Sequence, residues 1–323
     1  MRKITYVQAI NEALRQMLES DERVLLIGQG VTSPWYVGNT TTGLIERFGP
    51  GRIIDTPVSE SGVTGVAVGA ALAGMRPILV HPRMDFMYYG MDAIVNQAAN
   101  WHYMFGGQTS VPVVIWVIVN RGGEQGAQHS QSIQAVFAHI PGLKVVMPST
   151  PYDVKGLLTS SIEDGNPVIF IDDRWLYNDI GEVPEAQYSV PIGEGVVRRK
   201  GKDVTVVATS FMAGEAVKAA KLLEKDGVDA EVIDPRTIKP LDENLILDSI
   251  RKTGRLVIAD AAWKTGGIAG EIAALVSEKA VGSLKAPLKR VCLPDAPAPA
   301  SAPLEKVYYP KAREIVSAVK EIC

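Results

Sequence analysis

Short, wholly apolar segments recur along the first half of this chain, and longer segments of helical periodicity separate them. A strand that is apolar on both faces must be covered on both faces, which is typical of the parallel sheets of α/β proteins. We therefore predict an α/β domain with a mostly parallel sheet. Its predicted strands are Val24–Ile27, Ile53–Asp55, Pro77–Val80, Val113–Val119, Lys144–Val146 and Val168–Ile171. Its helices are predicted near residues 60–74, 87–105, 131–138 and 151–162, with an earlier helix that begins at a capping box of Thr5 and Gln8.

Residues 175–200 interrupt this alternation with prolines, acidic residues and no clear periodicity. The alternation then resumes, which predicts a second and smaller α/β domain. Its strands are predicted at Val204–Ala208, Ala230–Ile233, Arg255–Ala259 and near 289–293, with helices at Gly214–Lys225 and near 242–252 and 268–279. The expected domains are residues 1–180 and 201–323, joined by a linker at 181–200. A proline-rich tract at 294–303 is predicted to be extended and to lead into a final helix.

The composition excludes several classes of protein. A net charge of −3 and an isoelectric point near 5.9, without a basic cluster, argue against a nucleic-acid or anionic-membrane partner. The longest apolar run, Val113–Val119, is too short to span a bilayer, and the start of the chain has no apolar segment like that of a signal peptide. Cys292 and Cys323 are too few for a disulfide framework and have no metal-ligand spacing. We expect a cytoplasmic protein.

Glu60 opens the helix predicted after the second strand, and this helix has an unusual composition. Gly65, Gly69 and Ala73 recur at four-residue spacing, so they share one face. Each glycine costs ~1 kcal/mol of helix propensity relative to alanine, which suggests the close approach of a helix or a ligand. Pro57 and Ser59 are expected to fix the start of the helix. An acid in a first helical turn also has a purely structural use, since the helix dipole favours it by roughly 0.3–1 kcal/mol.

Among four histidines, His129 is the strongest candidate for chemistry. It lies in a polar, glycine-rich stretch directly after the most apolar strand, and ligands of parallel α/β sheets bind at the carboxyl ends of strands. A histidine there can exchange protons near neutral pH, although a loop histidine bonded to backbone or water fits the position equally well. His81 is a weaker candidate of the same kind. His102 and His139 fall in predicted helices, where a structural role is the simpler interpretation.

No P-loop, dinucleotide-binding glycine pattern or nucleophile elbow occurs in the sequence. Instead, four stretches together resemble the β subunit of the thiamine-diphosphate-dependent decarboxylase component of 2-oxo acid dehydrogenase complexes, of pyruvate, branched-chain or acetoin type. The resemblance extends over nearly the whole chain. It implies a transketolase-like pyrimidine-binding domain followed by a transketolase C-terminal-like domain. The matching stretches are Arg52–Gly62, Gln128–Gln131, Pro141–Pro148 and Val232–Leu241.

The resemblance assigns roles to individual residues. Glu60 matches the glutamate that bonds the aminopyrimidine ring nitrogen of thiamine diphosphate and so promotes proton loss from the thiazolium carbon. Phe86 matches the aromatic residue that stacks on the pyrimidine, and Gln29 and Val58 match further cofactor-binding positions. His129 matches a histidine near the substrate or the acyl acceptor. Some relatives bind K⁺, mostly through backbone oxygens, at the positions of Val113, Ser161, Ile162, Asp164 and Asn166, although Asp164-Gly-Asn166 alone is typical of a turn.

One motif of the wider family is missing from this chain. Relatives hold the diphosphate through a divalent metal that a Gly-Asp-Gly segment binds, and the chain has no such segment. The resemblance therefore implies that an α subunit holds Mg²⁺ and the diphosphate, in an α₂β₂ heterotetramer with the cofactor at the α–β interface. The implied substrate is a small 2-oxo acid, and a lipoyl acyltransferase core is a further implied partner. The small-residue helix is expected at a subunit contact.

The sequence also departs from these relatives near the expected pocket. Gly28-Gln29-Gly30 stands where many relatives read Gly-Glu-Asp, and Arg83 and Asp85 make their stretch more charged than it usually is. Two other functions therefore remain open beside the oxidative decarboxylase. One is a split transketolase or acyloin-forming carboligase, which passes a two-carbon unit to an aldehyde or sugar. The other is a non-catalytic scaffold subunit that keeps only the fold.

Overall fold

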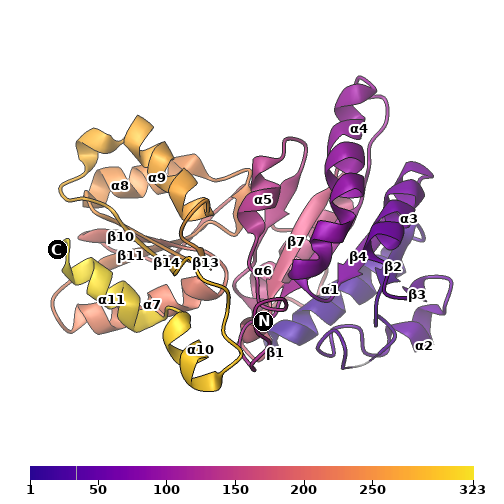
Figure 1. Cartoon of the computed structure of the whole chain (residues 1–323), viewed down its shortest axis with the longest axis horizontal. Helices are drawn as coiled ribbons and strands as arrows, with labels where there is room; N and C mark the ends of the chain where they lie inside the picture. Colours follow the sequence, from indigo (N-terminus) through magenta and orange to yellow (C-terminus); the bar gives the residue numbers. More distant parts are fainter. Residues whose placement is uncertain (34) are drawn as a thin grey trace. The chain divides into compact units, whose positions relative to one another are not determined.

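The structure is a computed structural model that describes residues 1–33 and 35–323 (Figure 1). The chain forms two compact units. Unit 1 contains Met1–Arg121 and Val136–Ile192, and unit 2 contains Gly122–Ala135 and Gly193–Cys323. The loop that carries His129 thus belongs to the same unit as the C-terminal half of the chain. No helix in the described part of the chain is both long enough and apolar enough to cross a bilayer.

Six parallel strands form the core of unit 1, in the order β6-β7-β5-β4-β2-β3. The central strand, β5, is buried along its whole length, as its uninterrupted apolar sequence predicts. This confirms the predicted parallel sheet, and the predicted strand ends differ from the observed ones by two residues at most. The strands are β2 (Val24–Gly28), β3 (Ile53–Asp55), β4 (Arg76–His81), β5 (Val114–Val119), β6 (Lys144–Val146) and β7 (Val168–Asp173).

The helices of unit 1 begin largely where the sequence predicts. Thr5 and Gln8 form the expected capping box at the start of α1, and Thr150 caps α6. Helix α3 packs against β4, and α1 packs against α6. A short 3₁₀ turn is η3 (Arg174–Leu176), and α5 has its first residues in unit 2. The α-helices are α1 (Tyr6–Ser20), α2 (Leu44–Phe48), α3 (Glu60–Leu72), α4 (Ala99–Met104), α5 (Gln134–His139) and α6 (Pro151–Glu163).

Two expectations for unit 1 need correction. The single helix predicted near 87–105 is three consecutive segments: the 3₁₀ helix η1 (Met84–Gly90), the π-helix η2 (Asp92–Ala98) and α4. Apolar periodicity does not distinguish these helical pitches. The irregular region after residue 175 contains β8 (Ile180–Val183), which pairs antiparallel with β1 (Arg2–Thr5). Both strands are largely exposed and lack an apolar run, so no pattern marked them.

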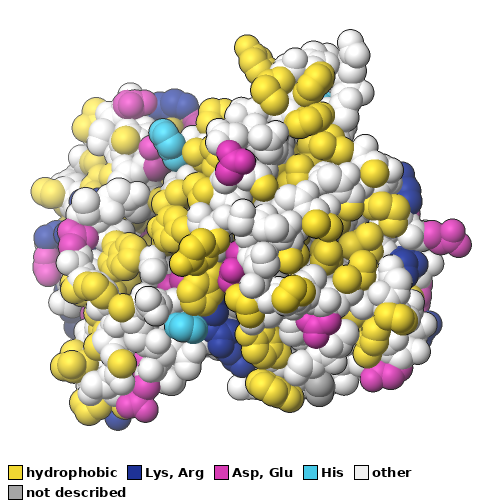
Figure 2. Space-filling view, turned by 45° about the vertical axis from the view of Figure 1, so that its right-hand side comes forward, with side chains coloured by type: hydrophobic (Ala, Val, Ile, Leu, Met, Phe, Trp, Pro, Cys, Tyr) yellow, Lys and Arg dark blue, Asp and Glu magenta, His cyan; other side chains and the backbone are white. Residues whose placement is uncertain are grey.

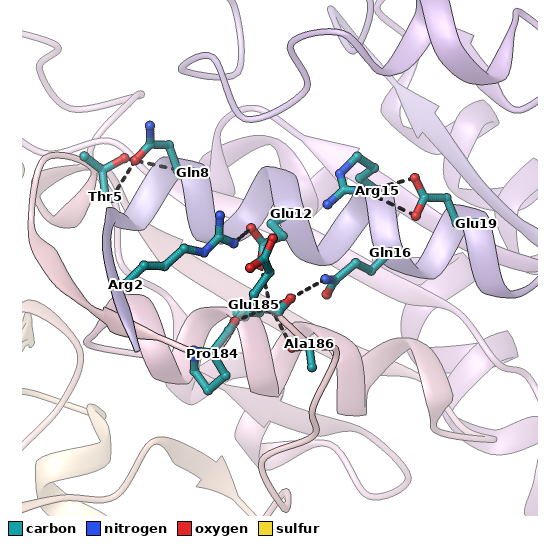
Figure 3. Close-up of polar contacts among 11 residues, drawn as sticks. Arg2, Thr5, Gln8, Glu12, Arg15, Gln16, Glu19, Pro184, Glu185 and Ala186 are labelled. Atoms are coloured by element: carbon teal, nitrogen blue, oxygen red, sulfur yellow. Dashed lines mark hydrogen bonds and ion pairs between the residues drawn. The ribbon is translucent and has the colours of Figure 1, made fainter.

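A buried lysine connects three segments of unit 1, and Figure 3 labels residues around it, among them Arg2, Glu12 and Glu185. Lys155, on α6, is fully buried, and its Nζ pairs with the Glu12 carboxylate on α1. The same Nζ donates to the carbonyl oxygens of Pro184, Glu185 and Ala186 at 2.7, 3.1 and 2.9 Å. Arg2 pairs with the other carboxylate oxygen of Glu12. We call these residues the Lys155 cluster, and every donor of its central ammonium group is used.

Unit 2 has a five-stranded sheet in the order β14-β13-β10-β11-β9, parallel except for β9. Helices α7 and α11 cover one face, and α8 and α9 cover the other (Figure 1). The strands are β9 (Val196–Arg199), β10 (Val204–Ala208), β11 (Ala230–Asp234), β13 (Leu256–Trp263) and β14 (Lys289–Leu293), with a short β12 (Thr237–Lys239). The helices are α7 (Phe211–Glu224), α8 (Glu243–Thr253), α9 (Ile268–Lys279), η4 (Val281–Ser283), α10 (Ala302–Tyr308) and α11 (Ala312–Lys320). The second predicted α/β domain and the final helix are confirmed.

Candidate active site

Glu60 is the first residue of α3 and lines a shallow, open pocket with about 10 Å³ of space for water. The pocket lies where β2, β3 and β4 end, and these strands are neighbours in the sheet. This is the edge at which ligands of parallel α/β sheets bind. The residues that line it are Gln29, Thr56, Pro57, Ser59, Glu60, Val63, Val80 and His81.

The carboxylate of Glu60 is half-buried and unengaged. Within residues 1–33 and 35–323 it makes no hydrogen bond and no ion pair. Ser59 occupies the N-cap position, as the sequence predicts, although its side chain makes no capping hydrogen bond. Since the Glu60 carboxylate is not used to hold the helix start in place, it is available to a ligand in the pocket.

The Asp55 carboxylate organises the two loops on one side of the pocket. It accepts hydrogen bonds from the Gly30 amide at 2.7 Å and from the Thr32 hydroxyl at 2.7 Å. It also accepts from the Thr56 amide at 3.0 Å, and the same amide donates to the Gly28 carbonyl. The loops after β2 and β3 are thus joined through one acidic side chain, which fixes the backbone on both sides of Gln29.

Thr64 links the start of α3 to the end of β4. Its hydroxyl donates to the Glu60 carbonyl at 2.6 Å, and its oxygen lies 3.2 Å from Nε2 of His81. Because the hydroxyl proton is used at Glu60, Nε2 of His81 must be the donor in the second contact. Burial lowers the pKa of His81 to about 4, so its imidazole is neutral at pH 7. The sequence marked His81 weakly and Thr64 not at all.

The three other predicted cofactor residues lie near Glu60 to different degrees. Gln29 lines the same pocket, and its amide donates to the Tyr36 hydroxyl. Val58 lies in the turn before α3 and is 68% exposed. Phe86 is half-buried on η1, which packs against α3, and is not among the residues that line the pocket. The structure therefore brings Gln29 and Glu60 together and places Val58 and Phe86 on adjoining segments.

The small-residue face of α3 is uncovered within this chain. Gly65 and Gly69 are exposed, and a Cβ added at either position would meet no atom within 4 Å among the described residues. The neighbouring Val66 is 60% exposed. Further apolar side chains gather at the projecting end of α4 (Figure 2), where Tyr103 is 88% exposed. The close approach that the sequence predicts along α3 is not made by the described part of this chain.

His129 lies in unit 2 and is half-buried, with its amide 3.5 Å from the Gly126 carbonyl oxygen. Its loop is attached firmly to that unit. The Glu124 amide donates to the Glu305 carboxylate at 3.0 Å, and Nε2 of Gln134 donates to both oxygens of Asp260 at 2.9 and 3.1 Å. The residues after His129 line a shallow depression together with Trp263, Leu293, Ala298 and Tyr308.

The predicted potassium-site residues lie near the end of α6 and the start of β5. Nη1 of Arg76 donates to the carbonyl oxygens of Ile162 and Asp164 at 2.7 and 3.1 Å. The Val113 carbonyl accepts a hydrogen bond from the Val168 backbone amide. In the turn that follows α6, the backbone amide of Asn166 donates to the Asp164 carboxylate. Two of the expected oxygen ligands thus already serve a guanidinium, so the donors fit a further cation poorly. In the described ranges, no group of three or more His, Cys, Asp or Glu side chains is arranged to hold a metal ion.

Charged residues also follow β5 and β7 at the same edge of the sheet. Arg121 forms a buried ion pair with Asp173 at 2.6 Å. Asp172 accepts hydrogen bonds from Nε1 of Trp116 at 2.8 Å and from the Tyr177 hydroxyl at 3.1 Å. Burial raises the pKa of Asp172 to about 7. Charged side chains directly after apolar strands were the available sequence signal for this cluster.

Comparisons with known proteins agree over the whole chain. The transketolase pyrimidine-binding domain matches residues 2–179, and the transketolase C-terminal domain matches residues 193–315. The β subunit of acetoin:2,6-dichlorophenolindophenol oxidoreductase of Cupriavidus necator is 45% identical, over 99% of this chain and 97% of that protein. The pyruvate dehydrogenase E1 component β subunit of Rickettsia felis is 41% identical, over 99% and 98%. The 2-oxoisovalerate dehydrogenase β subunit of Bacillus subtilis is 40% identical, over 100% and 99%.

A solved structure described as a split gene transketolase, inactive β4 tetramer, has the same fold. Its TM-score is 0.80, with 24% sequence identity over 99% of this chain and 98% of that one. At this identity the likeness concerns the fold alone.

Proposed function

This chain belongs to the β subunits of the thiamine-diphosphate-dependent decarboxylase component of 2-oxo acid dehydrogenase complexes, and on that premise we propose that it supplies the pyrimidine-binding half of an active site shared with an α subunit. The proposed reaction is decarboxylation of a small 2-oxo acid and transfer of the acyl group. When bound, thiamine diphosphate supplies the electron sink for the decarboxylation.

The unengaged Glu60 carboxylate is the observation that carries this proposal. It lies in a pocket at the carboxyl edge of the sheet and makes no hydrogen bond or ion pair within residues 1–33 and 35–323. A carboxyl group there can share a proton with a ring nitrogen of a bound aminopyrimidine, which is the atom that Glu60 serves in our proposal. A capping or ion-pair role would have occupied the carboxylate oxygens.

The other residues of the pocket support binding of a flat, partly polar ring. The Gln29 amide offers polar groups on one side, and Val63 and Val80 supply apolar surface that excludes water. The Thr64 hydroxyl bonds the Glu60 carbonyl, and His81 in turn bonds Thr64, so the first turn of α3 is fixed from two elements. We assign Phe86 to stacking on the ring and Val58 to the adjoining wall.

His129 is proposed to act near the substrate or the incoming acyl acceptor. Its half-buried position in a loop that is attached to unit 2 through Glu124 and Gln134 supports a held, solvent-accessible imidazole. A histidine of this kind can donate or accept a proton near neutral pH.

The rest of the site is proposed to come from an α subunit in an α₂β₂ heterotetramer. The Glu60 pocket, with about 10 Å³ of space for water, is far smaller than the about 300–1,000 Å³ of a complete ligand pocket. The uncovered small-residue face of α3 can accept a closely packed helix. The sequence has no Gly-Asp-Gly segment, so we assign Mg²⁺ and the diphosphate to α. A lipoyl acyltransferase core is a further proposed partner, and no step is assigned to potassium.

One observation favours a second function. The relative with 45% identity is named for acetoin, a neutral acyloin, and not for a 2-oxo acid. Acyloin cleavage or formation uses the same cofactor chemistry. Reduction of lipoamide or an artificial acceptor with a 2-oxo acid would support the dehydrogenase. Reduction of the same acceptor with acetoin in place of a 2-oxo acid would support acyloin cleavage, and a ketol or acyloin product without any redox acceptor would support a carboligase.

Glu60→Gln in the assembled α₂β₂ complex tests the proposal. We expect turnover to fall by about 10²–10⁴-fold, because the amide cannot exchange the proton, while the melting temperature stays unchanged. Glu46→Gln is the matched control, since Glu46 is an exposed acid in the first turn of α2. Unchanged turnover of Glu60→Gln would overturn the catalytic assignment and favour a scaffold subunit.

A further inference from the structure

Arg83 follows β4 and carries a buried nitrogen without an acceptor. Its Nη1 donates to the neighbouring Pro82 carbonyl at 2.7 Å, but its buried Nε has no hydrogen-bond partner within residues 1–33 and 35–323. An unsatisfied buried donor costs about 1–3 kcal/mol, and more when the group is charged. The chain therefore holds a guanidinium that is incompletely satisfied by its own atoms.

A second arginine lies at the same edge of the sheet. Arg174 follows β7, and its Nη1 donates to Oδ1 of Asn120, directly after β5, at 3.0 Å. Strands β4, β5 and β7 are neighbours, so the three residues share the carboxyl edge. Burial, and then the positive charge of Arg174, lower the pKa of Arg83. Two cations that repel each other are thus held close together.

The described acidic residues nearby form no ion pair with these two arginines, although the charge of the buried Asp85 raises the pKa of Arg83 in part. Asp173 is used by Arg121 in a buried ion pair. Asp172 forms its hydrogen bonds elsewhere, and burial raises its pKa to about 7, so it is partly protonated at neutral pH. In the described part of the chain, neither Arg83 nor Arg174 has a carboxylate within ion-pair distance. The buried Nε of Arg83 therefore still lacks an acceptor that an external carboxylate could supply.

Tyr36 connects Arg83 to the Glu60 pocket. It is close enough to raise the pKa of Arg83, against the larger lowering by burial and Arg174. The Tyr36 hydroxyl accepts a hydrogen bond from Gln29, and Gln29 lines the pocket with Glu60. Arg83 and the proposed cofactor pocket therefore lie in adjacent parts of unit 1.

We propose that Arg83 and Arg174 form a subsite for the carboxylate of the substrate. This inference rests on the proposed function and deepens it, because it selects a charged 2-oxo acid over a neutral acyloin. A planar guanidinium with an unused Nε and neighbouring Nη can bind a carboxylate with two parallel hydrogen bonds. The carboxylate would satisfy the buried Nε and relieve the repulsion from Arg174.

The kinetic test compares charged and neutral substrates on the α₂β₂ complex. For Arg83→Met we expect kcat/KM with pyruvate or 2-oxoisovalerate to fall by about 10²-fold, mainly through KM, and kcat/KM with acetoin to change by less than about threefold. Arg83→Lys should recover part of the loss, because it keeps the charge without the fork. Arg23→Met is the matched control, since it removes one charge from an exposed ion pair with Asp21.

Two further measurements separate a binding role from a structural one. The melting temperature of the Arg83→Met complex should be unchanged or higher, because the variant removes a buried unsatisfied donor and a repulsion. Oxamate, an unreactive carboxylate analogue of pyruvate, should bind the cofactor-free complex in calorimetry and lose at least tenfold in affinity in Arg83→Met. An equal loss for the acetoin reaction, or a destabilised or dissociated complex with unchanged oxamate binding, would overturn the proposal and indicate a carboxylate of the partner subunit.

These outcomes are distinct from failure of the proposed function. If the wild-type complex showed no thiamine-dependent turnover, oxamate binding that depends on Arg83 would still support the anion subsite. If the wild-type complex turned over 2-oxo acids but bound no oxamate, and Arg83→Met kept a normal KM, the subsite would be refuted while the decarboxylase assignment stood.

Discussion

Two charged regions of unit 1 differ in how completely the chain satisfies them. In the Lys155 cluster, a fully buried ammonium group has one carboxylate and three carbonyl oxygens around it. At the carboxyl edge of the sheet, the Glu60 carboxylate has no partner in the described ranges, and Nε of Arg83 is buried without an acceptor. In the first region the buried ammonium group has all its partners within the chain. In the second region the described residues leave the Glu60 carboxylate and Nε of Arg83 without partners.

This difference separates scaffold from site better than burial or charge alone. Buried polar groups in folded proteins are nearly always hydrogen-bonded, so each exception calls for an explanation. The Lys155 cluster joins α1, α6 and the chain after β8, which is a structural task. Nε of Arg83 is one of several such exceptions in the described ranges, and it lies where ligands of parallel sheets bind, as does the half-buried Glu60 carboxylate. Substitutions should therefore affect stability in the first region and activity in the second.

Lys155→Met gives the largest expected change in stability. It leaves the buried Glu12 carboxylate with only Arg2 and removes the donor from three carbonyl groups. We expect the free energy of unfolding to fall by about 3 kcal/mol in urea denaturation. Lys218→Met is the control, because Lys218 is an exposed lysine paired with Glu215 and should change stability by less than about 0.5 kcal/mol. Equal effects of the two variants would break the contrast between the regions.

His81→Gln should change mainly how stability depends on pH. The pKa of His81 is lowered from 6.5 to about 4 in the folded chain, so the unfolded chain binds more protons between these values. Stability contributed by the neutral imidazole is therefore lost as pH falls from 6.5 to 4, by up to about 3 kcal/mol. The glutamine keeps a donor for Thr64 without titrating, so its denaturation midpoint should depend less on pH across this window. His102→Gln, at an exposed position, should behave like wild type.

The two sheets were predictable because their strands are apolar on both faces, and this pattern is typical of parallel sheets that are covered on both sides. Strands β1 and β8 were not, because a largely exposed antiparallel pair leaves no apolar run. The 3₁₀, π and α segments between Met84 and Met104 share one apolar periodicity, so the sequence predicts a single helix there. Nothing in the sequence marks the segment Gly122–Ala135 as part of unit 2.

The site was partly predictable for a different reason. Glu60 and Gln29 each directly follow a strand or open a helix, so their edge of the sheet could be inferred. The Thr64–His81 hydrogen bond joins residues on two elements and has no local signature. The sequence around Lys155 is typical of a surface lysine. The carbonyl groups that accept hydrogen bonds from its Nζ come from a segment about thirty residues later, so no local pattern indicates its burial. The roles of His129, Phe86 and Val58 remain predictions.

We propose that this chain holds half of a thiamine diphosphate site and that only an α subunit completes it. Calorimetric titration of thiamine diphosphate with Mg²⁺ into the isolated chain, the isolated α subunit and their mixture distinguishes a half site from a whole one. We expect tight, stoichiometric binding in the mixture alone, and Glu60→Gln should weaken it. Tight binding by the isolated chain, together with turnover of a 2-oxo acid, would show that the chain needs no α subunit.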